Sequence, residues 1–460
     1  MSRRILIVLA AALGVGLLAR ADPPGPTHMN LKHGFSFAPP EGALAMPPQG
    51  SGMLAKWVAL DGEKKALAWT LTFYRARPEE SAKAALTPAD LPKYAKTLQD
   101  RLAEETQLAV DSAKVVTVAG KGAVDVVGSF ALGRRGNVEF RQFRRQVWVL
   151  TGPAEFLVVK MEGPLRDGEK LSALCDGVLK GLTVMDAQEL LKARQESLQR
   201  GNALLKELAG PAGTPRLHAA ATSESEWFLI QLEGKPIGFK AQAEGKTHRK
   251  GTPGLEIRTW TMTHLSGAPA GVQTQTLFVA DGLAGESWET LRRSGEGAKA
   301  LVDSESGTLR EGGKIACEIA HNGQAVTLHR EIPAAVDEGP VSIPNVYLPH
   351  AVGEMLARLV DRSAPGVYAF ATYDAQGDHM ARRVFRVIGP ARVAVGGTTV
   401  PAVEASDSAS DDAQAVQLWL DEKGLILRLS APGGLTMERT TRAAVFKAFP
   451  EAEAIVTGKN

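Results

Sequence analysis

The sequence predicts an α+β protein, and three observations support this class. Leu67, Trp69, Leu71 and Phe73 alternate with smaller or polar residues, as in a half-buried strand. Apolar residues recur at helical spacing in several later stretches. The 47 glycines and 26 prolines indicate many turns and short strands. We therefore expect an N-terminal α/β/α sandwich with an antiparallel sheet, then a mostly antiparallel β domain, a curved sheet or half-barrel with one inserted helix.

Residues 1–21 have the pattern of a secretory signal peptide. Two arginines precede an uncharged apolar run from Ile5 to Leu18. Small residues, Ala19 and Ala21, occupy the two positions that a signal peptidase recognises. The run is shorter than the ~20 residues that a membrane-spanning helix needs. We expect cleavage between Ala21 and Asp22, export to the periplasm or beyond the cell, and a soluble product with no transmembrane span.

The charge and the cysteines limit the partners and the covalent structure. The formal net charge of +2 includes three leader arginines, so the processed chain is close to neutral and no nucleic-acid partner is expected. Cys175 lies on an apolar helical stripe, and Cys317 lies between Ile315 and Ile319 on one strand face. We favour two buried free thiols over a disulfide.

The N-terminal region is expected to run from residue 31 to 185, after a Pro-rich linker at 22–30. A helix is predicted around Leu91 to Leu102, because apolar residues fall on one face. The remaining elements of the region are strands near 107–117, 121–131, 138–150 and 155–162, and a helix at 168–181.

Five arginines lie on the hairpin that joins two of these strands. They are Arg134, Arg135, Arg141, Arg144 and Arg145, interleaved with Phe140, Phe143 and Trp148. The cluster suits an anionic lipid, a polysaccharide or an acidic partner. We favour a structural role instead, in which the arginines protect an exposed sheet edge from aggregation.

A connector helix and linker are expected at residues 186–217. Asp186 and Glu189 have the spacing of a capping box. Leu191, Leu198 and Leu205 recur every seven residues, which suits a helix docked on a domain surface or, less favoured, paired with another helix. The stretch from Gly210 to Pro215 predicts the domain boundary.

Residues 218–450 are predicted to form the β-rich domain, followed by a tail at 451–460. Asn322-Gly323 between two alternating strands is a strong hairpin signal and places His321 opposite Gln324. Further turns are expected at 233–236, 376–377, 396–397 and 422–424. The inserted helix is predicted at 349–362.

We find no catalytic or metal-binding motif in this sequence. The stretch Gly285-Glu286-Ser287-Trp288-Glu289 lacks the second glycine of a nucleophile elbow. The acidic run 404–412 lacks the spacing of a calcium loop, so we interpret it as a solvated hairpin loop. We therefore expect no catalytic residues, no metal and no cofactor.

A ligand site is expected on the concave face of the β-rich domain, with the 349–362 helix as a plug or lid. An apolar pocket of this kind suits an apolar or lipid-like ligand. The expected lining residues are Trp260, Met262, Val352, Met355, Leu359, Tyr368 and Phe370.

Two stretches resemble known families. The opening Gly34-Phe35-Ser36-Phe37-Ala38-Pro39-Pro40-Glu41-Gly42 and the element order of residues 31–185 resemble PsbP-like/DcrB-like exported domains. Glu233 to Phe239 (EGKPIGF) and Leu418 to Leu425 (LWLDEKGL) are similar to exported β-rich domains of the lipoprotein-carrier, LolA-like type. These resemblances imply an α/β/α sandwich and a curved antiparallel sheet, and they supply no catalytic residues.

The resulting hypothesis is an exported, non-enzymatic protein that binds a lipid-like small molecule or an envelope partner. Two alternatives stay open: an exported hydrolase with a dispersed site, and a scaffold that acts through the connector helix or the arginine hairpin. The oligomeric state is also open.

Overall fold

The computed structural model describes residues 28–458 except 47, 49–51, 62–65, 78–85, 136–137, 154, 265–269, 296–299, 311 and 412. The signal peptide expected at residues 1–21 therefore lies outside the described residues. The described chain forms two compact units, one up to Lys192 and one from Ala193 on. Within these residues, none of the helices combines the length and apolar character needed to cross a membrane.

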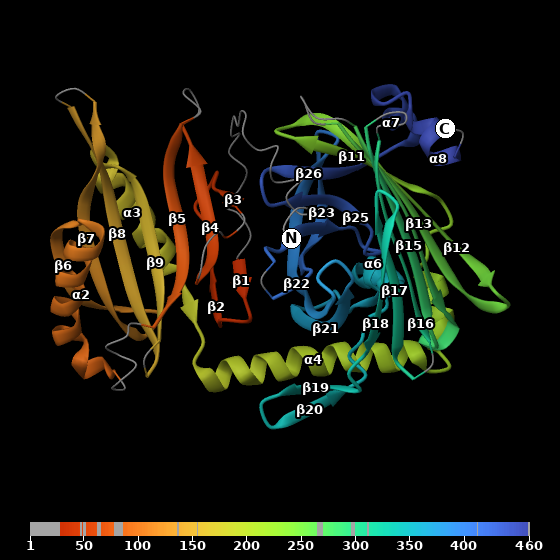
Figure 1. The fold of residues 1–460 in the computed structure, drawn as a ribbon, viewed down its shortest axis with the longest axis horizontal. Coiled ribbons are helices and arrows are strands. Elements are labelled where there is room, and N and C mark those ends of the chain that lie inside the picture. The colour runs from red at the N-terminus through yellow and green to blue at the C-terminus, as the bar shows by residue number, and fades with distance from the viewer. Residues whose placement is uncertain are drawn as a thin grey trace. The chain divides into compact units, whose positions relative to one another are not determined.

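The N-terminal unit is built on a seven-stranded antiparallel sheet (Figure 1). In spatial order its strands are β3 (Leu44–Met46), β4 (Met53–Leu60), β5 (Leu67–Ala76), β9 (Glu155–Pro164), β8 (Val138–Gly152), β7 (Lys121–Arg135) and β6 (Ala109–Val118). A small sheet adds β1 (His28–Asn30), β2 (Phe35–Phe37) and β10 (Thr183–Val184). The expected linker at 22–30 thus ends in a strand, because β1 pairs with β2.

One helix packs against each face of the seven-stranded sheet. Successive side chains of a strand point to opposite faces, and β9 shows the consequence. Phe156 and Val158 share a core with α2 (Leu91–Thr106), whereas Leu157 and Val159 share a core with α3 (Gly168–Lys180). The small sheet contributes its aromatic side chains to the α3 face.

Arg144 and Arg145 do not protect a sheet edge, so for these two residues the sequence interpretation is wrong. Strand β8 lies between β9 and β7, in the interior of the sheet. Arg144 pairs with Glu162 at 2.7 Å, and Arg145 pairs with Asp125 at 2.8 Å. These two arginines therefore neutralise carboxylates on neighbouring strands.

The C-terminal unit is built on a fourteen-stranded antiparallel sheet. In spatial order its strands are β18 (Gln324–Glu331), β17 (Lys314–His321), β16 (Leu301–Arg310), β15 (Glu286–Ser294), β14 (Gly271–Ala280), β13 (Thr252–Thr263), β12 (Lys235–Arg249), β11 (Glu226–Leu232), β26 (Leu435–Thr440), β25 (Ile426–Ala431), β24 (Val416–Leu420), β23 (Thr398–Ser408), β22 (His379–Val395) and β21 (Gly366–Asp374). A separate hairpin joins β19 (Ala335–Glu338) and β20 (Val341–Pro344).

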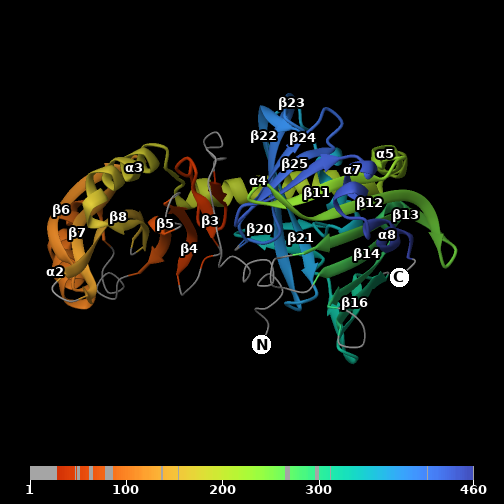
Figure 2. The same cartoon turned by 90° about the horizontal axis from the view of Figure 1, so that it is seen from above.

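This sheet curls around helix α6 (His350–Leu359), which is labelled among its strands in Figure 1. Figure 2 shows the strands of the sheet from above. Strands far apart in the sheet, such as β14 and β22, contribute side chains to one core around the helix. Near the two ends of the sheet, Arg330 on β18 donates to Asp378, in the turn after β21, at 2.8 Å. The strand order is open, but the curl brings its ends together.

Helix α4 (Ala187–Ala209) begins in one unit and ends in the other. Its second half packs on the C-terminal unit, where Leu205 and Leu208 are almost fully buried. The boundary between the units thus lies within the helix, ahead of the stretch from Gly210 to Pro215. That stretch runs into a further helix, α5 (Gly213–Ala220).

Two short helices pack on the convex side of the C-terminal sheet. They are α7 (Arg442–Ala448) and α8 (Ala452–Thr457), so a helix stands where a tail was expected at 451–460. Val445 and Ala452 are fully buried against Trp227 and Phe239. The end of the described chain therefore belongs to the folded unit.

The two cysteines are free and buried, and they lie in different units. The prediction of free thiols is confirmed. Burial raises the pKa of each thiol to about 12, so both thiols are neutral and poorly reactive near pH 7.

Gly201 provides a test of how closely α4 approaches the sheet. A Cβ atom at this position would lie 2.1 Å from the Ala369 carbonyl oxygen, whereas a Cβ at Gly177 in α3 would meet nothing within 4 Å. We expect Gly201→Ala to lower the free energy of unfolding by about 1–3 kcal/mol. The matched variant Gly177→Ala should raise it by up to ~1 kcal/mol through helix propensity. Urea unfolding measures both, and equal effects would contradict the close contact.

Candidate functional site

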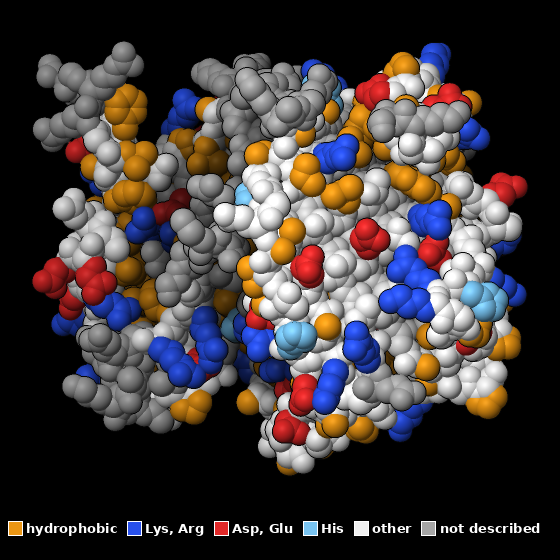
Figure 3. Space-filling view, turned by 45° about the vertical axis from the view of Figure 1, so that its right-hand side comes forward, with side chains coloured by type: hydrophobic (Ala, Val, Ile, Leu, Met, Phe, Trp, Pro, Cys, Tyr) orange, Lys and Arg blue, Asp and Glu red, His pale blue; other side chains and the backbone are white. Residues whose placement is uncertain are grey.

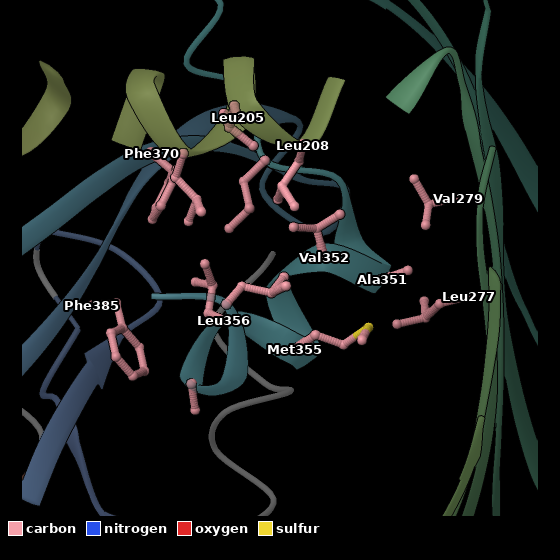
Figure 4. Close-up of a cluster of buried hydrophobic side chains, with 14 of the residues drawn as sticks. Leu205, Leu208, Leu277, Val279, Ala351, Val352, Met355, Leu356, Phe370 and Phe385 are labelled. Carbon is pink, nitrogen blue, oxygen red and sulfur yellow. The ribbon is translucent and has the colours of Figure 1, made fainter. Parts of the chain in front are cut away.

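The candidate site is the concave face of the fourteen-stranded sheet, whose apolar half is occupied by α6. Figure 4 shows α6 side chains between strand β14 on one side and Phe370 and Phe385 on the other. Val352 and Met355 are 0 % exposed, and Leu356 is 1 % exposed. The interior next to the helix is therefore filled by residues of the same chain.

The first turn of α6 is held by a fully buried carboxylate, that of Glu286 on β15. This group accepts hydrogen bonds from the His350 backbone amide at 2.7 Å and from the hydroxyl of Tyr347. The His350 ring nitrogen Nδ1 lies 3.1 Å from the same carboxylate. We call Glu286, Tyr347 and His350 the N-terminal latch. A carboxylate here also interacts favourably with the helix dipole.

The electrostatics of this latch favour a protonated imidazole. Burial alone would lower the pKa of His350, but the charge of Glu286 and its hydrogen bond outweigh burial and raise that pKa. The Trp288 ring packs on the imidazole, with ring centroids 4.5 Å apart. The arrangement resembles a buried ion pair more than a general base exposed to a substrate.

The last turn of α6 is held by a second buried ion pair. Arg358 donates to both carboxylate oxygens of Glu244 on β12, at 2.7 and 2.5 Å. Their side chains are 6 % and 0 % exposed. Burial would raise the pKa of Glu244, but Arg358 lowers it below its usual value. We call Glu244 and Arg358 the C-terminal latch.

Two further contacts tie the middle of α6 to the sheet. Lys240 on β12 lies 3.3 Å from Glu354. On the other side, Arg383 on β22 donates to the Gly353 carbonyl at 3.0 Å and pairs with Asp407 at 2.6 Å. The acidic run 404–412 is therefore not only a solvated loop, because its first half continues strand β23 and Asp407 faces the interior.

The concave face changes from apolar to polar along the strands. A polar belt of Gln242, Thr259, Gln275 and Thr290 crosses β12 to β15, each residue opposite the next. Three of the four are at most 5 % exposed, and the Gln275 side chain links Thr259 and Thr290 at 3.4 Å.

Two residues further along the same strands lies an outer row that is half-buried. It consists of Lys240, Thr261, Gln273, Arg292 and Asp303. These side chains carry charges of both signs, and Arg292 donates to Gln273 at 2.9 Å.

The structure divides the seven predicted lining residues between two faces of one sheet. Val352, Met355, Leu359, Tyr368 and Phe370 surround or belong to α6. Trp260 and Met262 point to the convex face, where they pack with α7 and α8. The first five therefore define one interior, and the last two do not contribute to it.

The sequence analysis missed both latches, although one signal was available for Glu286. Glu286 stands two residues before Trp288, so both side chains share the inward face of β15. A charged residue on the same strand face as a core aromatic residue is itself buried and needs a polar partner. Glu244 and Arg358 are 114 residues apart, and neither has a comparable local signal.

The raised pKa of His350 gives the N-terminal latch a defined pH dependence. A proton held more tightly in the folded state contributes stability below about pH 6.5, and this is lost as pH rises through the raised pKa. We expect wild type to be more stable than His350→Gln at pH 6, with a smaller difference at pH 9. Denaturant unfolding of both proteins measures the change.

The control for this measurement is His329→Gln, at an exposed position on β18. Its effect on stability should not change between pH 6 and pH 9. A His350→Gln effect that stays constant or grows with pH would contradict an ion pair at the latch.

No family model matches the chain, and no curated protein matches it. One similar solved structure is a beta-barrel-like protein of a domain of unknown function, DUF1849, from Brucella abortus. It is 13 % identical, the match covers 47 % of this chain and 94 % of that chain, and the TM-score is 0.31. Another is the cyanobacterial PsbP (CyanoP) from Synechocystis sp. PCC 6803. It is 15 % identical, the match covers 37 % of this chain and 96 % of that chain, and the TM-score is 0.27. Both likenesses are weak.

Proposed function

We propose that this is an exported, non-enzymatic binding protein that takes up a lipid-like amphiphile on the concave face of its C-terminal sheet. The observation that carries the proposal is the position of α6. A ten-residue helix of the same chain fills the apolar interior, and charged residues hold it at both ends. In this proposal α6 occupies the place of the ligand's apolar part.

The apolar half of the face has the composition that an acyl chain requires. If α6 moved out, Leu277, Val279, Phe370 and Phe385 would line the space that it leaves (Figure 4). Burial of apolar surface contributes about 25 cal/mol per Å², so a long acyl chain could replace much of the packing of the helix.

The latches explain why α6 could leave without unfolding the sheet. Buried ion pairs are often no more stabilising than apolar residues of the same volume, because the charges lose their hydration. The charged contacts at Glu286 and Glu244 therefore fix where α6 docks. Their net contribution to the free energy of unfolding is small, although the contacts are short. A helix of ten residues is also too short to be stable alone.

The polar half of the face suits a head group. The polar belt supplies amide and hydroxyl groups, and the outer row adds Arg292 beside Asp303, and Lys240, which pairs with Glu354 of α6. The face shown in Figure 3 has Lys and Arg side chains interspersed with Asp and Glu, with no large patch of one sign. Recognition would therefore depend on the interior surface.

The binding proposal predicts that a weakened latch increases ligand uptake. Tyr347→Phe removes one hydrogen bond to a buried carboxylate, worth about 1.5 kcal/mol, and should raise the apparent affinity for a dansylated fatty acid about tenfold. The double variant Glu244→Gln/Arg358→Met removes both charges of the C-terminal latch and should act in the same direction. Fluorescence titration measures both affinities.

The matched control is Arg258→Gln, which breaks an exposed ion pair with Glu256 on β13 and should leave the affinity unchanged. Failure of folded wild type and both latch variants to bind the fatty acid would overturn the binding proposal. Release of free fatty acid from phospholipid vesicles by the purified protein would instead favour the hydrolase alternative.

We further propose that the N-terminal unit is an exported domain of the PsbP-like/DcrB-like type, with the layers of an α/β/α sandwich. Support comes from the helices on both faces of its sheet and from the leader pattern of residues 1–21. Export brings the chain to the compartment in which envelope lipids or envelope partners are available.

Export predicts a defined N-terminus. Edman sequencing of the protein recovered from the periplasm or medium of a bacterial host should begin at Asp22. Ala21→Arg should block processing, because a large side chain does not fit the small-residue cleavage site. A processed wild-type chain that starts elsewhere, or that retains Ile5 to Leu18, would contradict the proposed cleavage.

A further inference from the structure

The fourteen-stranded sheet ends on β18, a strand with one unpaired side. Its register with β17 is unbroken, from Gln324 opposite His321 to Glu331 opposite Lys314. Among the described residues β18 stands last in the strand order, so no strand pairs with its outer side. Its eight residues include neither a proline nor a bulge, and all but Leu328 are exposed. The strand thus lacks devices that commonly protect an edge from pairing.

The register shows which backbone groups of β18 are free. In an antiparallel pair, alternate residues direct both of their backbone groups to the partner strand. Just beyond β18, the Ile332 amide donates to the Gly313 carbonyl at 2.8 Å, so the even-numbered residues face β17. The amides and carbonyls of Ala325, Thr327 and His329 therefore point outward, where they can form a second ladder.

The opposite edge of this sheet is covered. Helix α4 packs so closely on β21 that a Cβ atom at Gly201 would lie 2.1 Å from the Ala369 carbonyl oxygen. On the same strand, Ala371 forms a parallel bridge with Tyr347. Strand pairing at β18 therefore has no counterpart at β21.

One apolar side chain on the β18 edge lacks cover. Val326 and Leu328 lie opposite Ile319 and Cys317, on the face of the sheet that contributes to the core around α6. Leu328 packs against that core, whereas Val326 is 60 % exposed. An apolar neighbour beside Val326 would remove this surface from water.

We propose that β18 pairs with the β18 strand of a second copy of this chain, in an antiparallel register centred on Thr327. This register sets outward-facing residues opposite one another: Thr327 lies opposite Thr327, and Ala325 lies opposite His329. On the other face of the strand, it sets Val326 of each copy opposite Leu328 of the other. The exposed Val326 side chain thereby gains an apolar neighbour.

This complementarity favours a second copy over an unrelated strand. Arg330 lies opposite Gln324 of the other copy, and Glu331 lies opposite its turn, so like charges are not set opposite each other. A twofold axis through Thr327 uses both edges at once, so the association closes at a dimer. About six backbone hydrogen bonds and the Val326 contacts form a small interface, typical of weak or transient association.

The first test is sedimentation velocity of the purified full chain from about 5 to 500 µM. We expect a monomer–dimer equilibrium with a dissociation constant on the order of 100 µM. Thr327→Pro removes only an outward-facing amide, so it should weaken dimerisation about tenfold or more and leave the circular dichroism spectrum unchanged. The matched control Thr327→Val keeps the amide and should dimerise like wild type.

Val326→Glu provides a second disruption if Thr327→Pro fails to fold. The exposed position tolerates a charge in the monomer, whereas the dimer would set that charge against Leu328. We expect about tenfold weaker dimerisation here too.

Disulfide formation tests the register. Thr327→Cys should form a covalent dimer under mild oxidation about tenfold faster than Ala325→Cys, because the two copies of residue 325 would lie about 14 Å apart along the strands. The native thiols are buried and should not react.

Three results would each overturn the proposed pairing. They are a wild-type protein that stays monomeric at about 500 µM, folded Thr327→Pro or Val326→Glu that dimerises like wild type, and equal oxidation rates of the two cysteine variants.

Discussion

The carboxylate of Glu286 fixes the position of α6, and the core of the C-terminal unit is built around that helix. The carboxylate is fully buried and accepts the first backbone amide of α6, and the helix in turn fills the curl of the sheet. Fourteen antiparallel strands with an empty concave face would expose a large apolar surface to water. A ten-residue helix has little stability of its own, so its docked position needs both packing and a directional polar contact.

Both units repeat one arrangement: a helix packs on the apolar part of a sheet face, and polar side chains continue the same face. In the N-terminal unit α2 packs on the sheet near Trp148, while the ion pair of Lys160 and Glu162 lies further along the same face. In the C-terminal unit α6 covers Leu277, while Thr259 and Gln275 continue the same face. In both units, polar side chains therefore lie next to an apolar core, which supports them.

Much of the local structure could be predicted from the sequence, because it depends on neighbouring residues. Asn322-Gly323 correctly placed His321 opposite Gln324, and the apolar face of the inserted helix was found. Properties that depend on strand order could not be predicted. Arg144 and Arg145 are interior because β9 and β7 flank their part of β8. Trp260 and Val352 have the same apolar character, but only the curl of the sheet shows that they lie on different sides.

The close contact at Gly201 also determines how the chain can be divided. Leu198, Leu204 and Leu205 of α4 belong to the cores of the C-terminal unit, although they precede the glycine- and proline-rich turn that resembles a natural cutting point. A recombinant fragment that started at that turn would lack these leucines and with them part of its hydrophobic core. A gene fusion or domain rearrangement during evolution would keep the unit intact only if the junction lay before Ala193.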